Sequence, residues 1–530
     1  MFVATGILLS RLIGLVRQRV IAHYFGLGPD ADAWSAAFRI PNALQNLFGD
    51  QALSASFIPV YASLLAKGDR READRVAGAV ASLLTLLVAI LVLAGIATTP
   101  WLIAVIAPGF SGEKRELTIT LVRILFPGAG LLVMSAWCLG VLNSHHRFLL
   151  SYTAPVLWNL AIIATLVFFG EGTPLPLLAQ RLALGSVVGS ALQFGIQLPV
   201  VWRLAPNLRF TLDLTSEHVR TVVRNFGPVF ISRGVVQLSA YVDQLLATLL
   251  PTGAVAAITN AQTLSTLPIS LFGMAVSAAE LPAMSGITGA DAERHTALRE
   301  RLEGGLRQIA FFVVPSAVAF LALGDIVAAA LFQSGRFTHG DAVYVWGILA
   351  GSAVGLLAST LGRLYSSTYY ALRDTRTPLR CAIVRVVLTT VLGYLCAIPL
   401  PRWLGIDPVW GAAGLTASAG VAGWVEMLML RSTLATRIGP TRVPASHLAK
   451  LWAAAIAAAA VGWAVKLTFF PPDPLLDALV VLGPFGIAYF GITSALGIPE
   501  SARVLSRVRL RSTNGATESQ RHGNPHRDQK

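Results

Sequence analysis

The sequence predicts an all-helical, polytopic membrane protein with about fourteen transmembrane helices. Hydrophobic residues make up 55% of the 530 positions and charged residues only 13%, about half the charged share of a typical soluble domain. The mean hydropathy of +0.65 shows that apolar residues form the background of the chain. These observations exclude an ordinary soluble enzyme and a disordered chain.

Each apolar stretch long enough to cross a bilayer gives one predicted span. A span with its loop takes about 35–40 residues when about 20 of them cross the membrane, so little length is left for a soluble domain. The predicted spans are residues 2–25, 31–64, 76–107, 116–144, 150–170, 180–202, 220–250, 254–284, 305–333, 340–371, 379–400, 409–430, 447–468 and 475–497.

Basic residues in the loops predict the orientation of the spans. Most of the 41 Lys and Arg residues follow even-numbered spans or lie in the tail. The odd-numbered loops hold only Lys114, Arg115, Arg181, Arg336 and Arg402. Cytoplasmic loops are enriched in Lys and Arg, so we expect both termini in the cytoplasm. The same distribution explains the net charge of +14 without a nucleic-acid partner.

An internal repeat predicts two lobes. Residues 10–11 (Ser-Arg) recur at 232–233, and residues 47–49 (Leu-Phe-Gly) recur at 271–273. Six spans separate the copies, which is typical of parallel repeats whose substrate site lies between the halves. We therefore expect two six-helix lobes with parallel pseudo-symmetry and two further helices. The predicted divisions are residues 1–205 (spans 1–6), 206–435 (spans 7–12), 436–499 (two extra spans) and 500–530 (a disordered cytoplasmic tail).

The first span carries arginines at positions where lipid does not tolerate them. Arg11 lies about 13 Å along the helix from Phe2, near the middle of the bilayer. An arginine at that depth costs at least about 2.5–3.5 kcal/mol unless it faces water or a partner. We expect Arg11 and Arg17 to face a polar cavity. For Arg17, a structural ion pair or a side chain that reaches the interface remains an alternative.

A polar stripe runs along the second span. Steps of three and four residues place its members on one helix face. They are Asp32, Ser35, Arg39, Asn42, Asn46 and Asp50. Such a stripe cannot face lipid, because unsatisfied polar groups there cost several kcal/mol each. With the arginines of the first span it forms a positive surface suited to a phosphate or pyrophosphate, which arginine binds with two hydrogen bonds. The alternative is an internally neutralised helix pair without a ligand.

The corresponding stretch of the second lobe, residues 254–284, is polar but mostly uncharged. Its candidate cavity-lining residues are Gln262, Thr263 and Thr266. Asp243 in the seventh span and Arg385 in the eleventh are isolated charges, and we hypothesise that they form an ion pair or contribute to an ion site.

The chain lacks the sequence signatures of enzymes. It contains no GxxxxGK[ST], HExxH or GxSxG motif, and its three cysteines show no metal-binding spacing. We therefore expect no cofactor, no resident metal and no ATPase activity. Transport would depend on the membrane potential, a cation gradient or the substrate supply.

Several segments resemble the MurJ (MviN) lipid II flippases, of the multidrug/oligosaccharidyl-lipid/polysaccharide exporter superfamily. They run in the family's order over about 500 residues. These are SRLIGLVRQ (10–18), AHYFGLGPDADAWSAAFRIPNALQNLFGDQALSASFIPVYA (22–62), VIAPGF (105–110), LNSHHRF (142–148), APVLWN (154–159), LFQSGRF (331–337) and YYALRDTRTPLR (369–380).

The resemblance implies a fourteen-span fold with a central cationic cavity and a groove for the lipid tail at the last two spans. The implied substrate is undecaprenyl-pyrophosphate-linked peptidoglycan precursor (lipid II), moved to the periplasmic leaflet of the bacterial inner membrane. The implied partners are this precursor and membrane lipid, and we expect a monomer. The family's site residues match Arg11, Arg17, Asp32, Asn42 and Asp50.

The sequence also departs from the family pattern. Gln45 replaces an arginine, Gln18 replaces an aspartate, and Thr263 and Thr266 stand where some members carry arginine and glutamate. The residues around Asp243 do not favour the sodium site of some members. These departures leave open a flippase for another lipid-linked glycan. A drug/cation antiporter would favour an acidic cavity, a membrane glycosyltransferase would need an acidic pair, and a non-transporting scaffold would fit the neutral second lobe.

Overall fold

The structure is a computed structural model that describes residues 2–213, 215–287, 291–469 and 473–503. The side chains of residues 2–8, 50–51, 229, 231–240 and 291 are not described. Of the predicted tail, residues 504–530 therefore lie outside the described residues, as do the side chains of the second Ser-Arg pair.

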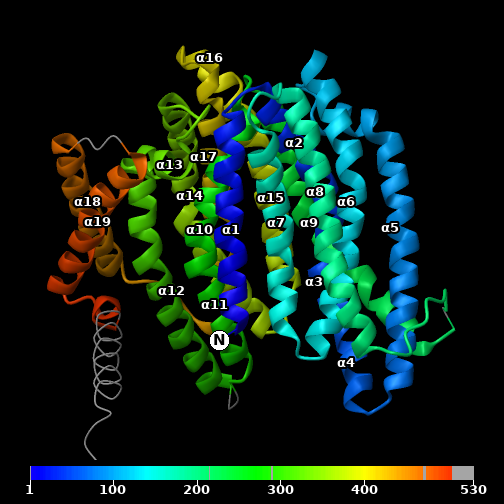
Figure 1. Cartoon of the computed structure of the whole chain (residues 1–530). Coiled ribbons are helices and arrows are strands. Elements are labelled where there is room, and N and C mark those ends of the chain that lie inside the picture. The colour runs from blue at the N-terminus through cyan, green and yellow to red at the C-terminus, as the bar shows by residue number, and fades with distance from the viewer. Residues whose placement is uncertain (1, 214, 288–290, 470–472, 504–530) are drawn as a thin grey trace, which may run out of the picture. The chain divides into compact units, whose positions relative to one another are not determined.

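The prediction of an all-helical, polytopic membrane protein is confirmed (Figure 1). In the described ranges there is no strand, only one isolated bridge between Ser334 and Phe337. All fourteen predicted spans correspond to helical segments, and 11 of these are long and apolar enough to cross a membrane. The other three, the first, second and seventh, are the spans richest in polar residues, so the count of fourteen stays a prediction.

Most predicted spans are single helices. Their charged flanks continue the helix beyond the apolar part, so several begin earlier than predicted. These helices are α1 (Phe2–Phe25), α5 (Arg70–Ile106), α6 (Gly112–Ser144), α7 (Phe148–Phe169), α8 (Leu175–Leu204), α9 (Glu217–Thr248), α14 (His339–Ala371), α15 (Arg376–Ala397), α17 (Gly411–Ile438), α18 (Ala445–Thr468) and α19 (Pro474–Ala495). The short elements α16 (Pro399–Leu404) and η2 (Pro408–Trp410) connect α15 to α17.

The second, eighth and ninth predicted spans are broken rather than continuous. The second consists of α2 (Pro29–Phe48), α3 (Asp50–Ser56) and α4 (Ile58–Ala66). The eighth consists of α10 (Ala254–Pro268), the π-helical turn η1 (Ile269–Met274) and α11 (Ala275–Ser285), and the ninth of α12 (Asp291–Ala322) and α13 (Gly324–Phe332). The predicted span bounds did not show these breaks, which occur where proline or glycine interrupts the regular hydrogen-bond ladder.

The chain divides into two compact units that do not coincide with the predicted lobes. Unit 1 contains residues 1–263, 332–344 and 393–415, and unit 2 contains residues 264–331, 345–392 and 416–530. Unit 1 thus holds the whole predicted first lobe, the whole of α9 from the predicted second lobe, and several other helix ends of that lobe. Those ends lie on the side that the loop charges predict to be periplasmic.

Each unit has its own packed interior. In unit 1, buried alanines along α5 let neighbouring helices approach, and Phe57, Tyr61 and Trp137 fill the space beside them. In unit 2, α18 and α19 lie side by side (Figure 1) and pack on α12. Tyr489 donates a hydrogen bond to the Phe311 carbonyl at 2.6 Å, which fixes α19 to α12.

Candidate functional site

Arg39 connects three helices within unit 1. Its guanidinium donates to the side-chain carbonyl of Gln262 on α10 and, at 3.5 Å, to that of Gln244 on α9. Asp243, also on α9, interacts with it electrostatically. The Tyr241 hydroxyl donates to the Arg39 carbonyl oxygen at 3.4 Å. The structure therefore brings together Arg39, Gln262 and Asp243, which the sequence assigned to separate lobes.

The Asp32 side chain caps the N-terminus of α10. Its carboxylate is 1% exposed and accepts hydrogen bonds from the backbone amides of Gly253 (2.8 Å) and Ala256 (2.9 Å). The ammonium of Lys114 on α6 donates to the same carboxylate at 2.6 Å. The first N–H groups of a helix lack intrahelical partners, and a carboxylate there also interacts favourably with the helix dipole. Asp32 thus joins α2, α6 and α10.

Arg17 lies among aromatic rings. Its guanidinium carbon is 4.9 Å from the ring centre of Trp158 on α7 and 5.7 Å from that of Phe38 on α2. Cation–π contacts of this kind contribute about 0.5–2 kcal/mol, more when the cation is desolvated. The buried Nε of Arg17 has no hydrogen-bond partner among the described residues. The side chain therefore keeps one unused donor beside Phe38 of α2 and Trp158 of α7.

A further polar contact to α10 comes from α1. The Gln18 amide donates to the side-chain oxygen of Asn260 at 2.8 Å, and both residues belong to unit 1. With the contacts of Asp32 and Arg39, this contact makes three polar connections between the first two predicted spans and residues 256–262 of α10.

The other predicted site residues are more dispersed. Arg11 and Asn46 are exposed, and Asn42 lines a water-sized void of about 20 Å³ between α2, α6, α7 and α8. Thr263 donates to the carbonyl of Thr259 in its own helix at 2.9 Å, and Thr266 is exposed. The side chain of Asp50 lies outside the described residues. A substrate contact at any of these positions stays a prediction.

Arg385 is not the isolated charge that the sequence suggested. Its guanidinium forms an ion pair with Glu426 on α17 at 3.0 Å within unit 2. The hypothesis of an Asp243–Arg385 pair was based on that isolation, so its premise is corrected. Sequence spacing could not identify Glu426 as the partner, because periodicity shows a helix face and not the neighbouring helix.

Sequence reasoning missed the role of Lys114. Standing at the start of a span, it was counted only as an outer-loop charge, and nothing near it in the sequence points to Asp32. The interhelical roles of Gln18 and Gln244 were also missed, since glutamines in a span carry no signal of their partner. Among the described residues, no group of three or more His, Cys, Asp or Glu side chains is arranged to hold a metal ion.

Comparisons with known proteins agree on one family. The family profile described as Lipid II flippase MurJ matches residues 21–473. The lipid II flippase MurJ of Burkholderia cenocepacia is 32% identical over 430 residues, which cover 80% of this chain and 80% of that protein. The probable lipid II flippase MurJ of Rhizobium meliloti is 29% identical over 534 residues, which cover 96% of this chain and 95% of that protein.

Solved structures show the same fold. A lipid II flippase MurJ in an inward closed conformation superposes with a TM-score of 0.76 at 21% identity and covers 93% of this chain and 98% of that chain. An inward-facing multidrug resistance MATE transporter of the MOP superfamily gives a TM-score of 0.65 at 20% identity over 81% of this chain and 95% of that chain. The family profile spans most of the sequence, and the chain belongs to the lipid II flippase MurJ family.

Proposed function

We propose that this protein is a lipid II flippase, a transporter rather than an enzyme, that moves the precursor from the cytoplasmic to the periplasmic leaflet. The observation that carries the proposal is the family match over residues 21–473. The multi-pass helical fold and the arginines of α1 and α2 support it. In this proposal the protein lies in the bacterial inner membrane, which the family supports, with both termini in the cytoplasm, which the loop charges support. It acts there as a monomer.

The chemistry of the substrate explains why a polar route is needed. Each hydroxyl or amide of a glycopeptide headgroup costs kilocalories to bring unpaired into hydrocarbon, and a pyrophosphate costs more. Arg17 and Arg39 offer guanidinium donors that suit phosphate oxygens. A cationic cavity lined by these residues, and by Arg11, Asn42, Asn46 and Asp50, would carry the headgroup while the polyprenyl tail stays in lipid beside α18 and α19.

Alternating access is the mechanism that these contacts support. Asp32, Gln18 and Arg39, all in the first half of the chain, form hydrogen bonds with α10 of the second half. Unit 1 also includes several helix ends of the second half that are predicted to be periplasmic. We infer that this set of contacts closes the periplasmic side, so that release of the headgroup requires them to break. Each contact is a non-covalent hydrogen bond or ion pair that can break and form again in every transport cycle, which suits a reversible gate.

The energy source in this proposal is the membrane potential or a cation gradient. Moving one elementary charge across the membrane is worth about 2.3 kcal/mol per 100 mV, so the arginines of α1 and the anionic substrate would both respond to the potential. The ion pair of Arg385 with Glu426 does not resemble a cation site, so we do not favour sodium coupling.

The experiment that tests the function is depletion of this protein in its native cell, with measurement of the lipid-linked precursor that accumulates on the cytoplasmic side. We expect lipid II, and accumulation of another lipid-linked glycan would redirect the proposal to that substrate. Rescue with Arg17→Ala should fail although the protein inserts.

Arg181→Ala is the matched control for this experiment. Its guanidinium also lies over an aromatic ring, that of Phe169, at 4.9 Å, but outside the polar faces of α1 and α2. Rescue should therefore succeed. If Arg17→Ala restored growth as fully as Arg181→Ala, the assigned role of Arg17 would be wrong.

A further inference from the structure

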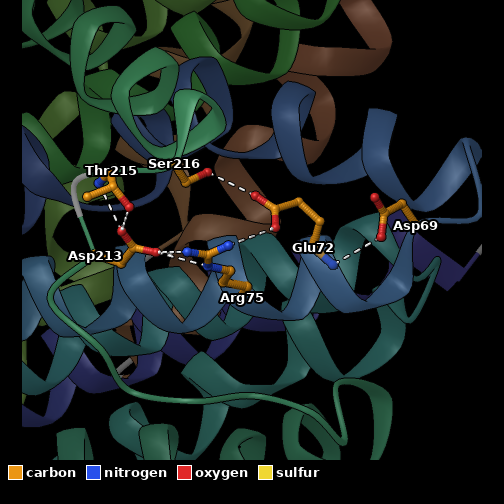
Figure 2. Close-up of polar contacts among 6 residues, drawn as sticks. All are labelled: Asp69, Glu72, Arg75, Asp213, Thr215 and Ser216. Carbon is orange, nitrogen blue, oxygen red and sulfur yellow. Dashed lines mark hydrogen bonds and ion pairs between the residues drawn. The ribbon is translucent and has the colours of Figure 1, made fainter.

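Residues 205–213 and 215–216, which belong to the linker between the predicted lobes, lie against the first turns of α5 (Figure 2). The Arg75 guanidinium donates to the Asp213 carboxylate from Nε at 2.9 Å. The Ser216 hydroxyl donates to Glu72 at 2.9 Å, and the Asn207 backbone amide donates to Asp74 at 3.0 Å. Hydrogen bonds from Thr215 and Arg75 lower the pKa of Asp213 to about 2, so this contact stays charged at neutral pH.

The backbone of the linker also touches α5 directly. A Cβ atom at Gly78 would stand 2.1 Å from the carbonyl oxygen of Arg209, so only glycine permits this approach. Arg209 is therefore held in place by its backbone while its side chain remains exposed.

The linker and α5 line an open recess of about 680 Å³, whose lining carries excess positive charge. It is lined by Arg71, Arg75, Asn207, Arg209, Thr211 and Asp213, three guanidinium groups against one carboxylate. Arg75 is occupied by Asp213, whereas Arg71 and Arg209 are exposed and have no carboxylate partner among the described residues. Two guanidinium groups are thus available to an anion.

An apolar crevice of about 140 Å³ lies between α3, α5 and α9, farther along α5 from the same end. It is lined by Leu53, Ser56, Val80, Leu83, Leu84, Leu87, Val222, Val223 and Phe226. Arg75 and Leu83 are eight residues apart on α5, about 12 Å at 1.5 Å per residue. Phe210 and Leu212, which flank the recess in the linker, are 57% and 62% exposed.

We propose that the recess and the crevice together bind one anionic phospholipid of the cytoplasmic leaflet. Its phosphate would lie on Arg71 and Arg209, and one acyl chain would enter the crevice. Two observations favour this occupant. The basic recess complements the charge of a phosphate, and it lies nearer the predicted membrane surface, whereas the apolar crevice lies deeper, as in a phospholipid headgroup and its acyl chain. Basic pockets on the cytoplasmic side of membrane helices bind anionic headgroups in this way. The bound lipid would stabilise the contact between the linker and α5.

Native mass spectrometry of the purified protein tests the proposal, with dioleoyl phosphatidylglycerol or the zwitterionic dioleoyl phosphatidylethanolamine added. We expect tighter binding of phosphatidylglycerol. The double variant Arg71→Gln/Arg209→Gln should weaken binding of phosphatidylglycerol about 10- to 30-fold. The attraction of two basic residues to an anionic lipid headgroup corresponds to a change in affinity of about this size. Val223→Trp, which fills the crevice, should weaken binding of both lipids.

Arg376→Gln/Arg380→Gln is the control, because it removes two exposed charges from the start of α15 in unit 2, which is also predicted to be cytoplasmic. It should leave phosphatidylglycerol binding unchanged. Equal binding of the two lipids to the unaltered protein, or equal loss in both double variants, would overturn the proposal. So would binding of a polyprenyl pyrophosphate but not phosphatidylglycerol at Arg71 and Arg209. Because binding is measured without transport, failure here leaves the flippase proposal standing.

Discussion

Asp32 holds three helices together through a single buried charge. Burying a carboxylate costs several kcal/mol, and the cost is offset only when partners satisfy its oxygens. Here two backbone amides and the Lys114 ammonium do so. Lys114 also lies 4.2 Å from the ring centre of Phe110, which leaves its charge partly shielded from water. The connection is stabilising while all partners are present. Removing one partner leaves a buried charge without compensation, which destabilises the fold.

Asp32→Asn should therefore destabilise the protein by about 3 kcal/mol, the cost of leaving one partner of a buried pair uncompensated. A lower melting temperature in detergent is the measurement. Asp32→Asn/Lys114→Met should recover part of the loss, because the second change removes the unpaired ammonium. A double variant no more stable than the single would show that the pair contributes little.

At the residue scale, the sequence predicted the polar face of α2 but not its partners. The spacing of Asp32 and Arg39 put them on one helix face, since side chains three, four and seven residues apart lie together. Lys114 was missed because a lysine before a span is interpreted first as an orientation signal. Glu426 was missed as the partner of Arg385 because no periodicity links residues of different helices.

At the element scale, the lengths of apolar stretches predicted where the helices lie, and the breaks within them were missed. Both copies of the Leu-Phe-Gly motif fall at interruptions: Gly49 separates α2 from α3, and Gly273 lies in the π-helical turn η1. A sequence repeat alone did not show this, since the interruption at Gly49 depends on an approach of the Gln45 carbonyl that only the folded chain reveals. The shared interruption supports the predicted repeat.

Gly49→Ala should disrupt this break. A Cβ atom there would stand 2.2 Å from the Gln45 carbonyl oxygen, so the backbone between α2 and α3 would have to move. We expect a lower melting temperature and reduced transport. Gly14→Ala in α1 is the control, because its Cβ would meet nothing within 4 Å and alanine favours a helix by about 1 kcal/mol. Equal behaviour of the two variants would mean that the break is not constrained by Gly49.

At the scale of the whole molecule, the two contact units cut across the lobes that the repeat predicts. Residues 254–263 of α10 belong to unit 1, where Asp32, Arg39 and Gln18 contact them. A repeat predicts topology, which every conformation of a transporter shares. It does not predict which helix ends are in contact in one conformation, and for this reason the contacts of α10 could not be read from the sequence.

Cross-linking α1 to α10 should stop transport if these contacts must break in each cycle. Gln18 and Asn260 are hydrogen-bonded at 2.8 Å and carry no charge, so Gln18→Cys/Asn260→Cys places two thiols there without altering Asp32 or Arg39. Cys138, Cys381 and Cys396 would first be replaced by alanine or serine. A short thiol-reactive linker with a cleavable disulfide should abolish flipping in vesicles, and reductant should restore it. Each single-cysteine variant treated in the same way should keep transporting. If the cross-linked protein flipped its substrate at an unchanged rate, α1 and α10 would not separate during transport, and the periplasmic gate would have to open elsewhere.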